Sequence, residues 1–487
     1  MHHDNGIWVS TEDLMREESF LQSAEKEFSM ENIDQTDGKW ETGRRDFLKM
    51  LGFGLGAATV AASCQIPVKK AIPYVTKPDA IVPGVANYFA SSIVNGGDYC
   101  AVLVKTREGR PIKIEGNSLS AITGGGTSAR AQAAVLGLYD TRRIQYAGKV
   151  SEGQVEKMEW PVLDREIKAK LATGAPVRII SNTIISPTAK KALADFVAKY
   201  PNTQVITYDP VSSAALLEAN KQSFGAAVIP SYKFDLADVI VSFGADFLGT
   251  WISPIEYARA YAKNRKVTPG KKAKMSRHYQ VESHMSLTGS NADNRVLIKP
   301  SEMGAAIVAL YNELSGGSGG PKVNEKAAAA IKKIAAELRN AAGKSLVVSD
   351  SNNVAEQVIV NKINDLLGNL NTTVDFGTPS YQRQGDERAL DGLLAEMNAG
   401  RVQVAIVWGA NPAWELRNAE AFKAAFAKVR VRVSFNGVVD ETTGLCNYAA
   451  PAHHLLESWG DAEPHSANYF TTLRHPSGGA QPARMGG

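Results

Sequence analysis

The sequence predicts an α/β protein in which a small β-rich domain precedes two doubly wound α/β units. From about residue 160 onward, continuous apolar runs alternate with helical segments, as in parallel sheets covered on both faces. A hairpin pattern precedes this alternation, between residues 99 and 116. With 487 residues the chain exceeds what one hydrophobic core usually serves, and a Gly- and Ser-rich stretch at 316–322 is typical of a linker.

The N-terminal part of the chain has the features of an export signal. Residues 1–43 form a polar extension, and the twin arginines Arg44 and Arg45 precede a charge-free apolar stretch, which is typical of a Tat signal. Small residues stand just before Cys64, as in a lipobox, so Cys64 is a candidate for lipidation. The alternative is an uncleaved anchor helix in which Cys64 is only a small apolar residue. We therefore expect a signal at 44–64 and a periplasmic, membrane-associated protein.

The predicted elements follow in chain order. A tether at 65–84 leads into the small domain at 85–150, whose hairpin joins strands 99–106 and 111–116. The first α/β unit, 151–315, has strands at 177–180, 203–208 and 238–244 and helices at 187–200, 211–222 and 254–263. After a linker at 316–324, the second unit, 325–470, has strands at 345–348, 402–408 and 431–435 and helices at 354–367 and 419–427. An irregular tail at 471–487 is expected to mark a truncation.

Composition excludes several function classes. The net charge of +4 is too small to predict nucleic-acid binding. There are three cysteines and no CxxC, so this sequence cannot supply four thiolates to an iron–sulfur cluster. It also has neither GxGxxG nor a P-loop.

Polar and small residues follow several predicted strands, where ligands of open α/β sheets bind. They are Ser181, Asn182, Asp209, Gly244, Ala245, Asp246 and residues 409–412, including Asn411. They are suitable contacts for a nucleotide-like phosphate or a guanine. Small and Asx residues also cap helices and form turns in any α/β protein, so both interpretations stay open.

Taken together, several segments resemble the molybdopterin (DMSO reductase-like) oxidoreductases. They are residues 110–117, 132–140 with Arg142 and Arg143, Trp160 and Pro161, 237–246, 409–412, 441–452 and 456–460. The resemblance covers about residues 85–470. It implies a pterin cleft near Ser212, Ser213, Gly244, Asp246 and Asn411.

Two departures from that family bear on function. Where cluster-bearing members have several cysteines, this chain has Cys100 alone, and Ser128 stands at the position of the last ligand. Ser212 or Ser213 falls where many members place the molybdenum ligand, but a helix N-cap pair is the other interpretation. We expect no molybdopterin and no metal in this segment.

A narrower resemblance covers the N-terminal extension as well. Residues 8–14, Phe20, residues 26–28 and the twin arginines resemble the B subunit of bacterial alternative complex III. This resemblance implies a cofactor-free first half, iron–sulfur clusters in a C-terminal half absent here, and a quinol-oxidising membrane complex. Its implied partners are a multi-haem cytochrome and polytopic quinol-binding membrane subunits.

Histidines offer two further candidates. His278, Glu282 and His284 share one face of a strand-like segment but match no common metal motif, and the resemblance places them in a polar loop at the cleft. His453 and His454 suit a proton shuttle or a surface pair.

Three function classes remain. The first is a scaffold subunit of a quinol-oxidising electron-transfer complex, without catalytic residues of its own. The second is a molybdopterin oxidoreductase with a serine metal ligand, and the third is an exported binding protein for small ligands.

Overall fold

The computed structural model describes residues 82–472, except 96–97, 268, 271–274 and 467. The chain divides after Lys77, and all described residues belong to the unit that follows. The predicted signal, with Arg44, Arg45 and Cys64, lies outside the described residues, so these assignments stay predictions. Among the helices that are described, none has the length and apolarity needed to cross a membrane.

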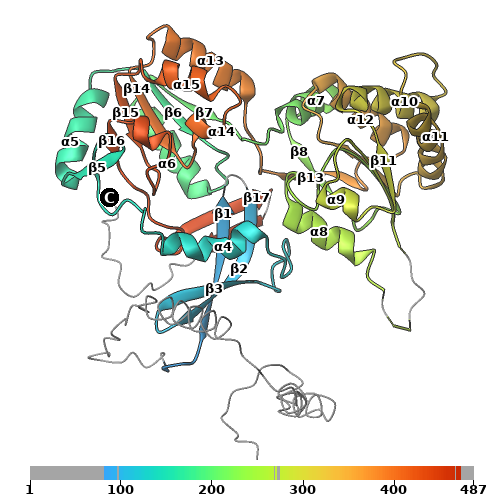
Figure 1. Cartoon of the computed structure of the whole chain (residues 1–487), viewed down its shortest axis with the longest axis horizontal. Helices are drawn as coiled ribbons and strands as arrows, with labels where there is room; N and C mark the ends of the chain where they lie inside the picture. Colours follow the sequence, from blue (N-terminus) through green and yellow to red (C-terminus); the bar gives the residue numbers. More distant parts are fainter. Residues whose placement is uncertain (1–81, 96–97, 268, 271–274, 467, 473–487) are drawn as a thin grey trace, which may run out of the picture. The chain divides into compact units, whose positions relative to one another are not determined.

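A small antiparallel sheet opens the described part of the chain (Figure 1). Its strands are β1 (Asn87–Asn95), β2 (Asp98–Arg107) and β3 (Arg110–Gly116), in the order β1-β2-β3. The turn between β2 and β3 has Glu108 and Gly109 in the left-handed region, as a tight hairpin requires. Helix α4 (Ala129–Leu138) packs on the sheet through Val135 and Leu138. The predicted hairpin is therefore confirmed.

A seven-stranded sheet has the order β5-β4-β16-β15-β14-β6-β7. Its strands are β4 (Gly148–Ser151), β5 (Gln154–Lys157), β6 (Val177–Ser181), β7 (Thr203–Thr207), β14 (Val404–Trp408), β15 (Val431–Ser434) and β16 (Tyr448–Ala449). The strands from β16 to β7 are parallel. Residues of α5 (Trp160–Leu171) and α6 (Pro187–Lys199) pack on one face, and residues of α13 (Glu387–Asn398) and α15 (Ala419–Phe426) on the other.

A four-stranded parallel sheet has the order β11-β10-β9-β12. Its strands are β9 (Val239–Phe243), β10 (Arg277–Glu282), β11 (Asn294–Leu297) and β12 (Ser345–Ser349). One face is covered by α10 (Met303–Ser315), α11 (Glu325–Asn340) and α12 (Val354–Leu366), the other by α7 (Ala214–Phe224) and α8 (Pro254–Lys263). The short α9 (Leu287–Ser290) follows β10, and a 3-10 turn at Pro300–Glu302 leads into α10.

A fourth sheet is built from distant parts of the chain. It has the order β18-β17-β13-β8, and its neighbouring strands are antiparallel. Its strands are β8 (Ile229–Tyr232), β13 (Val374–Ser380), β17 (Gly460–His465) and β18 (Asn468–Thr472). The remaining elements, α14 (Pro412–Glu415) and a 3-10 turn at Thr443–Leu445, follow strands of the seven-stranded sheet.

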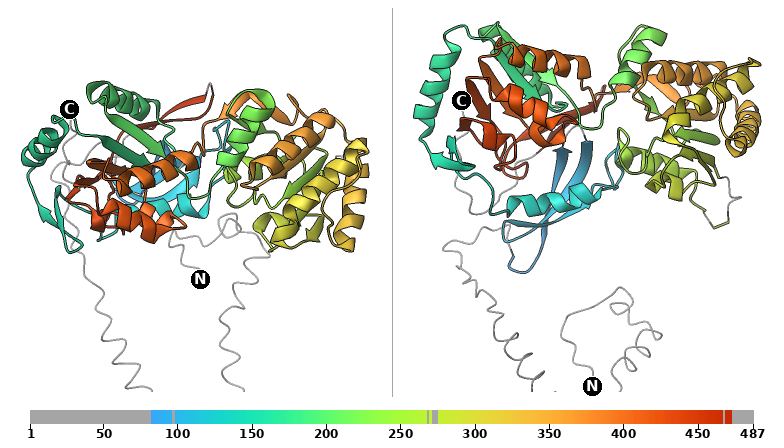
Figure 2. Two further views of the ribbon diagram at one scale, coloured as in Figure 1. Left: turned by 90° about the horizontal axis from the view of Figure 1, so that it is seen from above. Right: turned by 45° about the horizontal axis from the view of Figure 1, so that its top comes forward.

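The strand pairing divides the chain differently from the two consecutive units predicted at 151–315 and 325–470. Strand β6 pairs with β14, so the first and last thirds of the α/β region share one sheet. Figure 2 shows these green and orange-red strands side by side. The stretch at 316–324 connects α10 to α11, which pack on the same sheet, rather than joining two units. Apolar patterns identify parallel strands but carry no information about which strand lies beside which.

Candidate functional site

Each parallel sheet has a topological switch point, where ligands of open α/β sheets bind. In the four-stranded sheet, β9 connects forward to β10 on one side and pairs with β12 on the other. In the seven-stranded sheet, β6 connects to β7 on one side and pairs with β14 on the other. The predicted residues Gly244 and Asp246 follow β9, and Asn411 follows β14.

At the first switch point, the loops after β9 and β12 are in contact. Gly244 has φ +73°, and a Cβ at this position would lie 2.3 Å from Asp350 Oδ1. Only glycine fits such a position. Asp246 Oδ1 accepts hydrogen bonds from the backbone N (3.0 Å) and Oγ1 (2.7 Å) of Thr288. Asp246 therefore ties the end of β9 to the short helix α9.

A cleft of about 740 Å³ lies beside this contact. Its polar lining includes Ser283, Ser301, Asp350, Ser351, Asn353 and Glu356. Burial raises the pKa of Asp350 to about 6, although His284 opposes the shift. The N-termini of α10 and α12 would favour an anion here, but the two carboxylates oppose one. This lining is poorly suited to a pyrophosphate.

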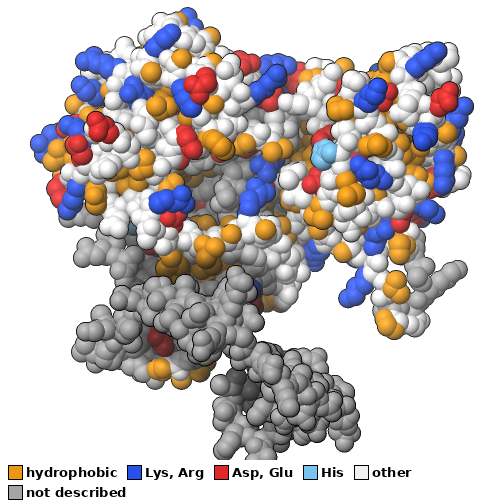
Figure 3. All heavy atoms as spheres, viewed as in Figure 1, with side chains coloured by type: hydrophobic (Ala, Val, Ile, Leu, Met, Phe, Trp, Pro, Cys, Tyr) orange, Lys and Arg blue, Asp and Glu red, His pale blue; other side chains and the backbone are white. Residues whose placement is uncertain are grey.

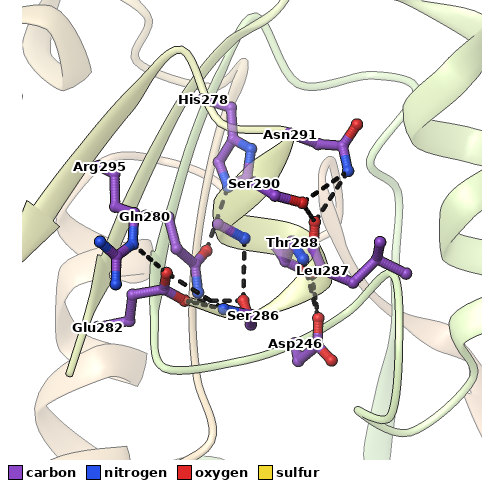
Figure 4. Close-up of polar contacts among 11 residues, drawn as sticks. Asp246, His278, Gln280, Glu282, Ser286, Leu287, Thr288, Ser290, Asn291 and Arg295 are labelled. Atoms are coloured by element: carbon purple, nitrogen blue, oxygen red, sulfur yellow. Dashed lines mark hydrogen bonds and ion pairs between the residues drawn. The ribbon is translucent and has the colours of Figure 1, made fainter. Parts of the chain in front are cut away.

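Strand β10 carries a buried polar face rather than the polar loop that the resemblance implied (Figure 4). His278, Gln280 and Glu282 alternate along it and are at most 1% exposed. Tyr261 Oη lies 3.2 Å from His278 Nδ1, and His278 Nε2 lies 3.2 Å from Gln280 Oε1. Burial lowers the pKa of His278 to about 4, so the ring is neutral at physiological pH.

Glu282 is engaged in a second part of this network. It accepts hydrogen bonds from Ser286 Oγ (2.7 Å) and from Arg295 Nε (2.5 Å), as Figure 4 shows. Hydrogen bonds from Arg295 and Ser286 lower the pKa of Glu282 against the opposing effect of burial. His284 instead acts electrostatically on Asp350. The structure thus gives His278, Glu282 and His284 separate partners, and no group of three metal-ligating side chains occurs among the described residues.

At the second switch point, Asn411 is bonded within the chain through every polar atom. Its Oδ1 accepts from the backbone N (3.1 Å) and Oγ1 (2.7 Å) of Thr442, and its Nδ2 donates to Glu441 (2.7 Å). Its backbone N donates to Glu415 Oε2 (3.1 Å). The side chain therefore joins the loops after β14 and β15.

Asp209 and Asn182 have similar roles on the neighbouring strands. Asp209 accepts from the backbone N (3.1 Å) and Oγ1 (2.6 Å) of Thr183 and from the backbone N of Gly385 (2.9 Å). Asn182 Nδ2 donates to the Tyr208 carbonyl (3.0 Å). These residues hold the loops after β6 and β7 together, which favours the turn-forming interpretation for them.

Ser212 and Ser213 lie between β7 and α7. Ser212 Oγ accepts a hydrogen bond from the backbone N of Ala214 (3.1 Å), at the start of the helix. Ser213 is the N-cap residue and is buried, but its side chain makes no capping bond. This geometry agrees with a helix start.

The structure brings Cys100 and Ser128 together, as the family resemblance implied. Cys100 Sγ lies 3.5 Å from the Gly126 carbonyl, and its thiol contacts the backbone N–H of Ser128. Ser128 caps α4 through a hydrogen bond from the Ala131 backbone N to its Oγ (3.2 Å). Burial raises the pKa of Cys100 to about 11, so the thiol is protonated. One protonated thiol beside a helix cap does not fit a [4Fe–4S] cluster.

His454 is a structural residue rather than the proton shuttle considered from the sequence. Its Nε2 lies 3.1 Å from the Ala134 carbonyl, and its Nδ1 accepts from the Leu456 backbone N (3.2 Å). These partners require the neutral ring, and burial lowers the pKa of His454.

Cys446 is buried, and burial raises its pKa to about 12. Cys100 and Cys446 are both free thiols.

Sequence reasoning missed Asp350 and Glu356 in the cleft. Asp350 directly follows the apolar strand β12, in the same way that Asp246 follows soon after β9, and this pattern could have identified it.

On the face drawn in Figure 3, acidic and basic side chains are interspersed over the described residues.

The chain resembles known proteins in sequence and in fold. No family model matches the sequence. The chain is 22% identical over 405 residues to the "Menaquinone reductase, molybdopterin-binding-like subunit" of Nitratidesulfovibrio vulgaris; the match covers 74% of this chain and 57% of the relative. The chain thus spans little more than half of that relative's length.

The structure resembles acetylene hydratase from Pelobacter acetylenicus with a TM-score of 0.62 and 11% sequence identity. The likeness covers 81% of this chain and 67% of the other. The predicted fold, α/β and DMSO reductase-like, is thereby confirmed: the chain has the fold of the molybdopterin oxidoreductases.

Proposed function

We propose that this chain is a subunit of a membrane-associated, quinone-linked electron-transfer complex, and that the described part is a scaffold that holds no molybdopterin or cluster. The homologue named as a menaquinone reductase subunit supports the link to quinone. The resemblance of the N-terminal extension supports a complex like alternative complex III. Its partners would then be a multi-haem cytochrome and polytopic membrane subunits, with iron–sulfur clusters carried outside this span.

The observation that carries the scaffold proposal is the use of polar side chains at the switch points. Asn411 is bonded to Thr442 and Glu441, and Asp246 to Thr288, so these side chains already have partners within the chain. Carboxylates of Asp350 and Glu356 line the nearby cleft, where they would repel a phosphate. The paired side chains hold the loops to one another, and the carboxylates make the cleft unfavourable for a phosphate group.

Metal analysis tests this proposal on the complex purified from membranes. We expect iron and haem from other parts of the complex but molybdenum and tungsten far below one atom per chain. Stoichiometric molybdenum or tungsten would instead support an oxidoreductase with Ser212 or Ser213 on the metal. Co-purification with a haem protein and a quinone-linked activity tests membership of the complex. A chain isolated alone, without either, would favour a small-ligand binding protein.

We also propose Tat export to the periplasmic side of the cytoplasmic membrane, with Cys64 lipidated. The twin arginines and the small residues before Cys64 support this. Intact-mass measurement distinguishes a lipidated Cys64 from a retained signal segment.

A further inference from the structure

An ion-pair cluster lies on the strand that carries Cys100, the one thiol that the family resemblance places among the cluster cysteines. Asp98 begins β2, and Cys100 follows two residues later on the same face of that strand. Asp98 Oδ1 pairs with Arg383, and its Oδ2 pairs with Arg130 of α4. Two guanidinium groups therefore share one carboxylate on the face that carries Cys100.

Burial differs between the two arginines. The Arg383 side chain is 6% exposed and that of Asp98 is 18% exposed. Arg130 is 55% exposed, so its pair with Asp98 is screened by solvent. A mostly buried guanidinium–carboxylate pair is costly to break by removing one partner, because the other charge stays buried. Removing Arg383 should therefore destabilise this contact more than removing Arg130.

Arg383 belongs to a loop, residues 381–386, that is attached to several elements. The backbone N of Tyr381 donates to Pro464 in β17 (2.8 Å), and that of Gln384 donates to Thr183 after β6 (2.7 Å). The backbone N of Gly385 donates to Asp209 after β7 (2.9 Å). Arg383 itself has φ +57°, a backbone conformation that a non-glycine residue adopts only when its surroundings hold it there.

We infer that Arg383 and Asp98 form an ionic latch, with Arg130 as its outer partner, which fixes the small β-rich domain to the loops after β6 and β7 through the loop at 381–386. The latch would act in a catalytic or a non-catalytic subunit alike, so its test is independent of the metal analysis proposed above.

Hydrogen exchange on the full purified protein tests the latch. We expect Arg383→Gln to accelerate exchange in β2 and in the loop at 381–386 by at least about tenfold, and Arg130→Gln by less than about threefold. Asp98→Asn added to Arg383→Gln should partly reverse the acceleration, because it removes the carboxylate charge that is left buried without its inner partner. Arg142→Gln is the matched control: its guanidinium is 84% exposed and pairs with Asp140 within the small domain.

Arg383→Lys keeps the charge but loses the planar fork, and we expect an intermediate acceleration. This variant decides the question if Arg383→Gln does not fold. Exchange in β2 no faster than in the Arg142→Gln control would overturn the latch. So would an equal acceleration in β9–β12, because the effect would then be general.

Discussion

Gly244 and Asp350 are in direct contact at the switch point of the four-stranded sheet, where the loops after β9 and β12 meet. Glycine is required there for two separate reasons. Its φ of +73° disfavours other residues, and a Cβ would lie 2.3 Å from Asp350 Oδ1. The two residues therefore fix the separation of the loop after β9 from the loop after β12, and the loop after β12 lines the cleft.

The first prediction concerns this contact. Gly244→Ala should lower the free energy of unfolding by about 2 kcal/mol or more, from backbone strain and the clash with Asp350 together. The matched control is Gly409→Ala after β14, which has φ +62° and no atom within 4 Å of a Cβ, so it tests backbone strain alone. Denaturant unfolding measures the free energy of unfolding of both variants. In an Asp350→Ala background the cost at Gly244 should fall to that of the control; an unchanged cost would contradict the contact.

Asp350 itself should make stability depend on pH. Its folded pKa of about 6 lies above the ordinary 3.8, so the folded chain holds a proton that the unfolded chain has lost. The resulting penalty grows as the pH rises from about 4 to 6, is complete above 6, and is at most about 3 kcal/mol. Asp350→Asn should therefore stabilise the protein at pH 7.5 and have little effect at pH 4, as thermal melts would measure. Equal effects at both pH values would count against a raised pKa.

His278 should make stability depend on pH in the opposite direction. Its folded pKa of about 4 lies below the ordinary 6.5, so between these values the unfolded chain binds a proton that the folded chain excludes. Stability should fall as the pH drops from 6.5 to 4, by up to about 3 kcal/mol. His278→Gln should reduce this acid sensitivity, whereas a His453→Gln control at a partly buried position should retain it. If His278→Gln and the wild type have the same melting temperature at pH 5, His278 is not the source of the acid sensitivity.

The sequence allowed prediction of those features that depend on local pattern. Helix α8 was predicted at both ends, because Pro254 opens it, and the β2–β3 hairpin followed from its alternation and turn. The polar residues after β9 and β14 were identified from their place behind apolar strands. Contacts between distant segments could not be predicted. Nothing local to Asp98 indicates Arg383, and nothing in β6 indicates that β14 lies beside it.

The scaffold proposal makes a specific prediction for Ser212 and Ser213. Ser212→Ala removes a hydrogen bond at the start of α7 and should cost about 1 kcal/mol of stability. If neither serine binds a metal, the quinone-linked activity of the purified complex should stay within about twofold of wild type for Ser212→Ala and for Ser213→Ala. Exposed Ser290→Ala in α9 is the control. Loss of even an outer partner of a metal ligand costs about 10–100-fold, so a decrease of that size at either serine, with the complex intact, would favour the molybdopterin enzyme.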